Sequence, residues 1–190
     1  ISKEDFAPNV LALGSKGDNT YILTASYMVS TMAMKKSFVP NGQSITLDEL
    51  KKLEKDMGVQ AFQMLTRDDI IHYAMEMNSS EFLDVETGNS NFNSPEFYAL
   101  LEYAKEYPKE VDWESIDDSY WMESQYAMRE NDALMQYFAI YALRDIAYRE
   151  QGEYGEEVAF VGFPGGTGTT GVIHPYIQMA ISADSKHPEI

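Results

Sequence analysis

The sequence predicts an α/β fold, in which amphipathic helices alternate with short apolar strands around a small sheet. Threonine capping boxes at Thr46 and at Thr66 begin two of the helices. The segment 158–181 holds two apolar, β-branched and aromatic runs on either side of a loop rich in glycine and threonine. Each run is typical of a strand, and the loop 165–171 is too flexible to be helix or strand.

The first part of the chain predicts two strands and two helices. Ser15–Asn19 is typical of a turn, and short strands are predicted over 21–24 and over 30–37. After Thr46, leucines and a methionine trace one apolar helix face, and Gly58 ends that helix. A second helix follows Thr66 by the same capping device.

A hairpin separates these helices from the rest of the chain. Gly88 and Asn89 supply its tight turn between two short alternating runs. Ser94 then caps a helix whose first turn holds Pro95, at a position where no N–H is needed. Beyond it the sequence predicts a helix over 120–129 capped by Asn131, a buried strand over 133–138, and a helix over 141–148 ended by Gly152.

The composition favours a packed globular protein and argues against several partners. The 190 residues suffice for one well-cored domain, or for one lobe with pieces of another. A net charge of −17 argues against nucleic acid and anionic membranes, because binding phosphate needs the opposite field. No apolar run approaches the ~20 residues that a membrane-spanning helix needs. The sequence begins with Ile1 rather than Met, so we expect a piece cut or processed from a longer chain.

The residues that usually carry catalysis form no recognisable constellation. The chain has no cysteine, and its three histidines are scattered without the spacing of metal ligands. The loop 165–171 lacks the Gly-Lys-Ser/Thr ending of a phosphate-binding loop, and a strand rather than a helix follows it. Asp84, Glu86 and Gly88 meet only part of the pattern of a calcium-binding loop. The sequence therefore predicts neither catalytic residues nor a metal nor a cofactor.

Two stretches resemble one known family. The first is Phe82-Leu-Asp-Val-Glu-Thr-Gly88 followed by Phe92-Asn-Ser-Pro-Glu-Phe97. The second is Phe160-Val-Gly-Phe-Pro164, the glycine-rich loop, a strand, and Ala180-Ile-Ser-Ala-Asp-Ser-Lys-His-Pro-Glu189. In this order they resemble an extracellular solute-binding protein of a sugar-uptake ABC importer (family 1). The resemblance implies a periplasmic-binding-protein-like (type II) fold, in which hinge strands cross between two α/β lobes that close on a ligand.

The resemblance also implies a division of the chain. Residues 1–29 would be the end of the first lobe and a hinge strand, 30–157 the second α/β lobe, and 158–190 the return segment to the first lobe. Most of the first lobe would then lie outside the sequence. The strands over 21–25 and 173–181 would be what is left of it, with exposed apolar side chains.

The ligand-binding residues follow from family position. Sugar sites pair flat aromatic rings with short polar groups in a concave cleft. Tyr141 stands where an aromatic residue just after a strand stacks on the sugar in the family, with Tyr137 as the alternative. For either, an aromatic ring packed under the sheet is the competing interpretation. The remaining candidates are Tyr27, Trp121, His174 and Tyr176.

The resemblance implies a receptor that binds a sugar or oligosaccharide, catalyses no reaction and delivers its ligand to the permease of an ABC transporter. Such a receptor would be a cell-surface lipoprotein of a Gram-positive bacterium, or periplasmic, and any lipid anchor would lie outside this sequence. The alternative is an acidic α/β carbohydrate hydrolase that uses two carboxylates between Asp112 and Asp132 as acid and base. An interaction domain with no small ligand is the third possibility.

Overall fold

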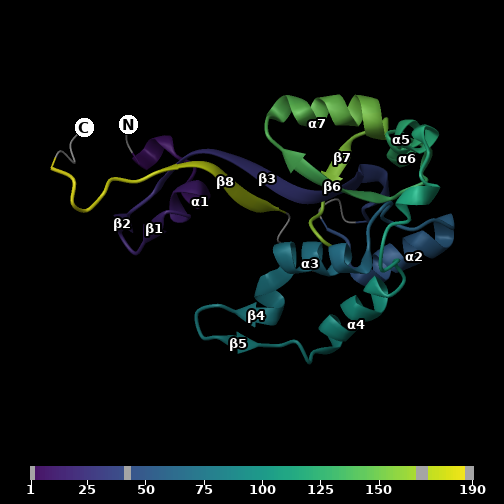
Figure 1. The fold of residues 1–190 in the computed structure, drawn as a ribbon, viewed down its shortest axis with the longest axis horizontal. Coiled ribbons are helices and arrows are strands. Elements are labelled where there is room, and N and C mark those ends of the chain that lie inside the picture. Colours follow the sequence, from purple (N-terminus) through teal and green to yellow (C-terminus); the bar gives the residue numbers. More distant parts are fainter. Residues whose placement is uncertain (1–2, 41–43, 166–170, 187–190) are drawn as a thin grey trace. The chain divides into compact units, whose positions relative to one another are not determined.

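The computed structural model describes residues 3–40, 44–165 and 171–186. Most of the loop 165–171 therefore lies outside the described residues, as does His187. The chain divides into two compact units, one formed by Ile1–Val29 with Ile173–Ile190 and the other by Ser30–Val172. Helices and strands alternate along it, which confirms the predicted α/β class (Figure 1).

The first unit is built from short elements and parts of two longer strands. A hairpin formed by β1 (Ser15–Lys16) and β2 (Asn19–Thr20) turns at Gly17, whose φ of 60° lies in the left-handed region. This turn confirms the one predicted over Ser15–Asn19. The elements are the 3-10 helix Lys3–Asp5, α1 (Pro8–Ala12), β1 (Ser15–Lys16), β2 (Asn19–Thr20), the first part of β3 (Leu23–Lys35) and β8 (Val172–Met179), which pairs with β3.

Strand β3 is continuous where the sequence predicts two strands. It runs from Leu23 to Lys35 through both units. Neither glycine nor proline interrupts this stretch, and it contains several β-branched residues. Once the backbone is extended, nothing in the stretch favours a break.

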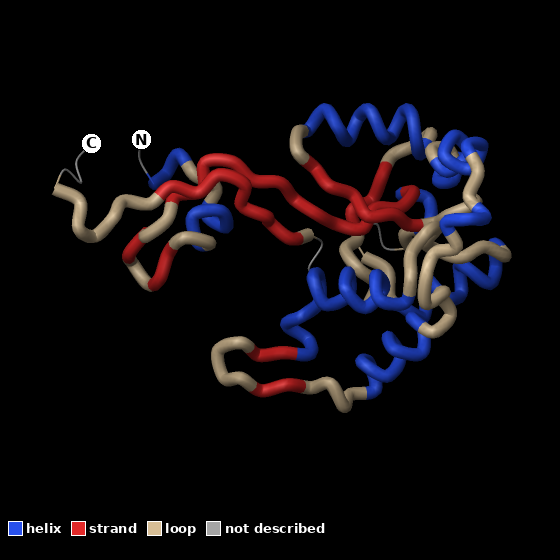
Figure 2. The backbone as a smooth tube through the Cα atoms, in the orientation of Figure 1, coloured by secondary structure: helices blue, strands red, loops and turns tan. Residues whose placement is uncertain are grey.

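The second unit contains most of the helices, which appear in blue in Figure 2. Helices α3 (Arg67–Phe82) and α7 (Leu143–Arg149) cover opposite faces of its sheet (Figure 1). Its helices are the 3-10 helix Lys36–Phe38, α2 (Leu47–Met57), α3 (Arg67–Phe82), α4 (Pro95–Ala104), the 3-10 helix Trp113–Ser115, α5 (Asp118–Ser124), α6 (Ala127–Glu130), α7 (Leu143–Arg149) and the π-helical turn Glu150–Tyr154. Its strands besides β3 are β4 (Leu83–Asp84), β5 (Asn89–Ser90), β6 (Met135–Ile140) and β7 (Val158–Phe160).

The sheet has the order β6-β3-β7, so the long strand β3 lies in its centre. Strand β7 pairs antiparallel with β3 in the register Ala33↔Phe160, Met34↔Ala159, Lys35↔Val158. The second compact unit includes β7 and runs from Ser30 to Val172. The division into lobes at residue 157 stays a prediction.

The predicted helix starts are confirmed by their hydrogen bonds. Thr46 Oγ1 accepts from the N–H of Glu49 at 3.2 Å, and Glu49 Oε2 accepts from the N–H of Thr46 at 2.8 Å. Thr66 and Asp69 form the same capping box at the start of α3. Ser94 Oγ likewise accepts from the N–H of Phe97 at 3.2 Å to begin α4.

Two predicted helices differ from the structure. The helix over 120–129 is two short helices, α5 and α6, and Asn131 ends the second in a left-handed conformation with φ 64°. The helix predicted from Tyr141 begins at Leu143 and continues beyond Gly152 as a π-helical turn. It ends at Gly155, with φ 74°. An extra turn of this kind leaves no signature in a pattern based on the α-helical period.

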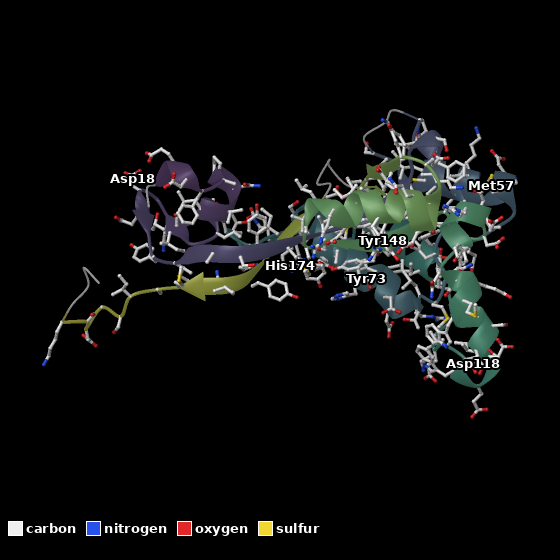
Figure 3. All side chains as sticks on the ribbon, turned by 90° about the horizontal axis from the view of Figure 1, so that it is seen from above. Asp18, Met57, Tyr73, Asp118, Tyr148 and His174 are labelled. Atoms are coloured by element: carbon white, nitrogen blue, oxygen red, sulfur yellow. The ribbon has the colours of Figure 1, made fainter. Side chains whose placement is uncertain are left out.

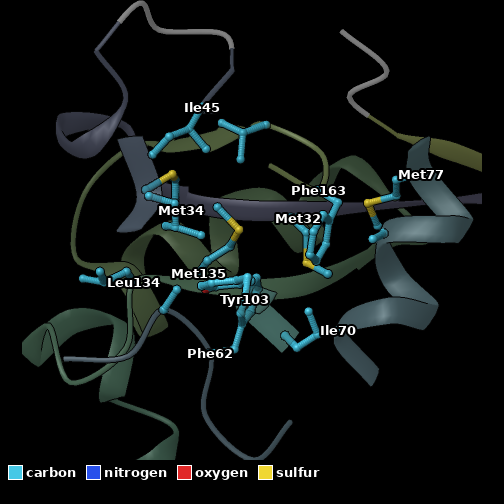
Figure 4. Packing of buried hydrophobic residues seen from close by; sticks show 14 of the residues in the cluster. Met32, Met34, Ile45, Phe62, Ile70, Met77, Tyr103, Leu134, Met135 and Phe163 are labelled. Atoms are coloured by element: carbon cyan, nitrogen blue, oxygen red, sulfur yellow. The ribbon is translucent and has the colours of Figure 1, made fainter. Parts of the chain in front are cut away.

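The core lies on both faces of β3. Met32 and Met34 point to one face, where they pack with Phe62, Tyr103 and residues of α3 (Figure 4). Ala33 points to the other face. Side chains of a strand alternate between its faces, so the part of β3 from Ser30 to Lys35 is covered on both sides. The second cluster is Ala33, Ala127, Met128, Ala133, Phe138, Tyr154 and Val158.

Candidate functional site

A groove of about 370 Å³ in the second unit brings aromatic side chains together. We call it the aromatic groove. Its walls come from the segment after α2, the 3-10 helix at Trp113, helices α5 and α6, and the start of β6. The lining residues are Phe62, Gln63, Met64, Leu65, Trp113, Tyr120, Trp121, Ser124, Ala127, Met128, Ala133, Met135, Gln136 and Tyr137.

Backbone hydrogen bonds fix the wall formed by Phe62–Leu65. The carbonyl of Ala61 accepts from the N–H groups of Leu134 and Met135 at 3.0 and 2.9 Å, which ties this wall to the start of β6. Within the wall Met64 adopts φ 59°, a conformation that is uncommon for residues other than glycine. The chain therefore turns sharply where it faces the groove.

A half-buried carboxylate holds the same wall from behind. Glu54 Oε1 accepts from the N–H of Ala61 at 2.6 Å, from the Tyr103 hydroxyl at 2.9 Å and from the Tyr107 hydroxyl at 3.3 Å. Burial raises the pKa of Glu54 above its ordinary value, although these three hydrogen bonds oppose the rise. Burial also raises the pKa of both tyrosines, with Tyr103 the more strongly affected.

Helix α5 presents the groove's adjacent pair of large rings. It is capped by Asp117 Oδ1, which accepts from the N–H groups of Ser119 and Tyr120 at 2.9 and 3.1 Å. The hydrogen bond from the Ser119 hydroxyl lowers the pKa of Asp117, and the backbone bonds add to that effect. Figure 3 labels the next residue, Asp118, at the start of this helix. The rings of Tyr120 and Trp121 meet edge to face, with centroids 6.0 Å apart.

Strand β6 contributes an aromatic ring and an amide. Tyr137 stacks on Tyr73 of α3 with ring centroids 4.9 Å apart and an angle of 27° between the planes. Burial raises the pKa of Tyr73, which is labelled in Figure 3. Gln136 donates from Nε2 to Glu153 Oε2 at 3.3 Å. Both side chains are therefore held by neighbours outside the groove.

A second hollow, of about 560 Å³, adjoins the aromatic groove and shares Tyr120 and the wall Phe62–Leu65 with it. Glu110, Asp112 and Asp132 line it, so this end of the surface is acidic. Asp132 also accepts from Gln63 Nε2 through its backbone carbonyl at 3.1 Å. The two hollows together form one surface that is aromatic at one end and carboxylate-rich at the other.

Two of the six predicted ligand-binding residues line the aromatic groove, and the other four are not among its lining residues. Trp121 and Tyr137 both line the aromatic groove. Tyr141 follows the end of β6, is 61% exposed and is not among the residues lining that groove. The other three belong to the first unit: Tyr27 is on β3, and His174 and Tyr176 are on β8.

Several lining residues were not predicted from the sequence. Trp113 lies in an acidic, irregular stretch, and it is 63% exposed in the structure. Tyr120 could have been found as the aromatic neighbour of Trp121. No sequence signal marks Gln63 or Gln136, because their role as lining residues depends on a groove that segments far apart in the sequence form.

The groove can bind a ligand that has both apolar faces and hydroxyl groups. Both tryptophans of the chain line it, with Phe62, Tyr120 and Tyr137 beside them. Flat rings provide stacking surfaces, and amide groups provide hydrogen bonds of fixed direction. Within residues 3–40, 44–165 and 171–186, no group of three or more acidic, histidine or cysteine side chains is arranged to hold a metal ion. In the same residues, no helix is long and apolar enough to cross a membrane.

The chain is similar in structure to solute-binding proteins. A solute-binding protein of an ABC transporter from Thermotoga lettingae, solved with α-D-tagatose, matches 96% of this chain at 14% identity and a TM-score of 0.50. An extracellular solute-binding protein of family 1 from Alicyclobacillus acidocaldarius matches 100% of it at 13% identity and 0.50. A chitin oligosaccharide binding protein matches 98% of it at 17% identity and 0.50.

The fold is that of ABC-transporter solute-binding proteins. The resemblance found in the sequence is thus confirmed as a resemblance of fold. The chain spans about half the length of these solute-binding proteins, between 50% and 51% in the three structures. No protein-family model and no curated protein sequence matches the chain.

Proposed function

We propose that the chain is the second lobe, with parts of the first, of an extracellular solute receptor that binds a sugar or oligosaccharide. The receptor delivers this ligand to the permease of an ABC transporter and catalyses no reaction. The aromatic groove is the observation that carries the proposal. Flat rings beside amide groups suit a carbohydrate, whose C–H faces stack on rings while its hydroxyls form hydrogen bonds.

The exposed rings are the stacking platforms in this proposal. Trp121 is 51% exposed and Trp113 is 63% exposed, so both can cover an additional apolar face. Gln63 and Gln136 use Nε2 within the protein, and in the described part of the chain no hydrogen bond engages their Oε1 atoms. Each Oε1 can therefore accept a hydrogen bond from a ligand hydroxyl.

The four predicted ligand-binding residues that do not line the aromatic groove remain part of the proposal. Tyr141 presents an exposed ring after β6. In the first unit, Tyr27 and Tyr176 are 42% and 60% exposed, and His174 is half-buried. We assign these four side chains to ligand contacts outside the aromatic groove.

The division into lobes is also part of the proposal. Strand β8 exposes the apolar side chains of Ile177 and Met179, which lie two positions apart and so share one face of the strand. A contiguous exposed apolar surface usually marks an interface. We assign this surface to contact with the rest of the first lobe.

The location is extracellular or periplasmic, with any lipid anchor outside this sequence, and the structural neighbours include proteins described as extracellular.

Calorimetric titration tests the proposal with α-D-tagatose, which one structural neighbour was solved with, and with a chitin oligosaccharide, the class named for another. Tagatose and chitotriose are titrated into the whole chain and into Trp121→Ala. We expect saturable binding of at least one saccharide, weakened by about 1–3 kcal/mol in the variant, as for other aromatic anchors at interfaces. Tyr98→Ala is the matched control, because Tyr98 is exposed on α4 and does not line the groove.

The same mixtures distinguish the receptor from the alternative hydrolase. Asp112 and Asp132 line the hollow beside the groove, where a carboxylate pair could act on a glycosidic bond. Chromatography of chitotriose after incubation should recover it unchanged. Release of shorter saccharides would replace the receptor with the hydrolase. Absence of both binding and turnover would overturn the assignment of the groove to carbohydrate.

A further inference from the structure

A separate cavity of about 180 Å³ lies in the second unit among α2, α3, α4 and the segment after β7. Its base is apolar, and the residues that form it are mostly buried in the core. The apolar lining residues are Leu47, Ala74, Phe82, Ala99, Leu100, Phe163 and Pro164. We call this space the α3 cavity. An apolar base of this kind accommodates a hydrocarbon chain.

A buried amide with an unused oxygen lines the α3 cavity. Asn78 is 4% exposed and donates from Nδ2 to the carbonyl of Phe163 at 3.2 Å. Its Oδ1 is buried, and no described residue donates a hydrogen bond to it. Leaving a buried acceptor unsatisfied destabilises the folded state, so a native protein that keeps one usually has a use for it.

The backbone of α3 explains how Asn78 reaches this position. Its φ of −121° and ψ of 19° are not helical, and they interrupt α3 with a kink. The kink places the amide against the segment at Phe163, which follows β7. The amide is thus fixed by a long-range hydrogen bond and is not free to turn its oxygen to solvent.

Carboxylates predominate among the polar side chains at the α3 cavity. Asp48, Glu81 and Glu96 line it, together with Thr46. Among the described lining residues there is no lysine or arginine. Glu96 and Asp48 are exposed and Glu81 is half-buried, so the negative charge surrounds the opening while the base stays apolar. The site therefore attracts a cation that carries hydrogen-bond donors.

We propose that the α3 cavity binds a small primary alkylammonium ion. The alkyl chain occupies the apolar base, and the ammonium group donates to Asn78 Oδ1 and to a rim carboxylate. A hydrated metal ion gains nothing from the apolar base, whereas an alkyl chain does. The size is suitable, since a cavity of ~150 Å³ lined by apolar side chains binds a molecule as large as benzene. This site is independent of the proposed carbohydrate function.

Titration with butylammonium chloride tests the site in the whole chain. Amide chemical shifts in a ¹H–¹⁵N NMR spectrum report binding, with 1-butanol as a neutral probe of the same length. We expect saturable shifts at Ala74, Asn78 and Leu100, with butylammonium bound about tenfold more tightly than butanol because its donor is charged. Equal affinity for the two probes would show an apolar cavity only, and would overturn the proposal.

A pair of variants on one helix separates the site from general attraction to an acidic protein. Glu96→Gln removes a rim charge, and Glu102→Gln removes an exposed charge of α4 that does not line the cavity. We expect butylammonium affinity to fall about threefold in Glu96→Gln and to stay unchanged in Glu102→Gln, as for one partly exposed charge pair. Equal effects would contradict the site. Asn78→Leu should reduce the preference over butanol without abolishing it, because the rim carboxylates still attract the charged probe. If that variant does not fold, Glu96→Gln still decides the question.

Discussion

Glu54 Oε1 accepts a hydrogen bond from the backbone N–H of Ala61 at 2.6 Å, so the end of α2 holds the wall of the aromatic groove. The carbonyl of Ala61 in turn accepts from Leu134 and Met135 at the start of β6. A carboxylate outside the groove therefore joins two of the groove's walls through one backbone unit. The position of Phe62 and its neighbours depends on this link as much as on their own packing.

The buried position of Glu54 predicts a pH-dependent stability. Burial raises its pKa above the ordinary value of 4.5, so the folded chain binds a proton at pH values where the unfolded chain has lost it. This contribution to stability is fully present below the unfolded pKa and is lost as pH rises through the folded pKa. The variant Glu54→Gln keeps an acceptor and has no such titration. Relative to it, the wild-type free energy of unfolding should fall as pH rises above 4.5.

Urea denaturation of both proteins from about pH 4 to about pH 8 measures this difference. The pH dependence that arises from other titrating groups is common to both proteins and cancels in the comparison. Glu49→Gln is a useful comparison, since hydrogen bonds within the capping box lower the pKa of Glu49. Its contribution should be lost as pH falls, which is the opposite sign. A difference between wild type and Glu54→Gln that does not vary with pH would contradict the assignment.

Lys35 is predicted to stabilise the wall formed by α6. It is 6% exposed, and its Nζ donates to the carbonyl of Arg129 at 2.8 Å and to Asn131 Oδ1 at 2.6 Å. Lys35→Met keeps the apolar stem and leaves those acceptors without this donor. We expect the free energy of unfolding to drop by about 1–3 kcal/mol. Thermal or urea denaturation measures the change.

The neighbouring lysine provides the control for that experiment. Lys36 is 56% exposed and pairs with Glu157, which is 71% exposed. Exposed ion pairs contribute little, so Lys36→Met should change stability by less than about 1 kcal/mol. If the two lysine variants lost equal stability, the loss in Lys35→Met would not come from its hydrogen bonds to the α6 segment.

Two glycines test where the helix after β6 ends. Gly155 has φ 74°, and a Cβ there would lie 3.2 Å from Arg129 Nε. Gly155→Ala should cost about 1–2 kcal/mol, the penalty of a left-handed conformation for an L-residue. Gly152 has no positive φ, and a Cβ would meet no described atom within 4 Å. Gly152→Ala should therefore leave stability unchanged or raise it by up to about 1 kcal/mol. A lower melting temperature for Gly152→Ala than for Gly155→Ala would place the end of this helix at Gly152.

Local chemistry made the helix starts and the hairpin predictable. The capping boxes at Thr46 and Thr66 and the turn at Gly88 depend on residues a few positions apart. The end of the helix after β6 was not predictable in the same way. Glu150 Oε1 accepts from the N–H of Val158, which belongs to the next strand, so a tertiary contact accompanies the extra turn.

The candidate site was predictable only in part. A single aromatic residue such as Trp121 is recognisable as a potential platform, and so is the ring of Tyr137 next to a buried strand. The groove itself depends on the backbone link between Ala61 and β6, which joins residues far apart in the chain. Trp113 comes from a third segment. A pattern of neighbouring residues carries no information about such a meeting.

Tryptophan fluorescence reports carbohydrate binding in the aromatic groove, because both tryptophans of the chain line it. The whole chain is titrated with tagatose and with chitotriose, and the emission spectrum is recorded at each concentration. We predict a saturable shift of the emission with at least one of the two saccharides. In Trp121→Phe this shift should be smaller, because the contribution of Trp121 is missing. Emission that stays constant with both saccharides, in a chain that shows a cooperative unfolding transition, would contradict carbohydrate binding in the groove.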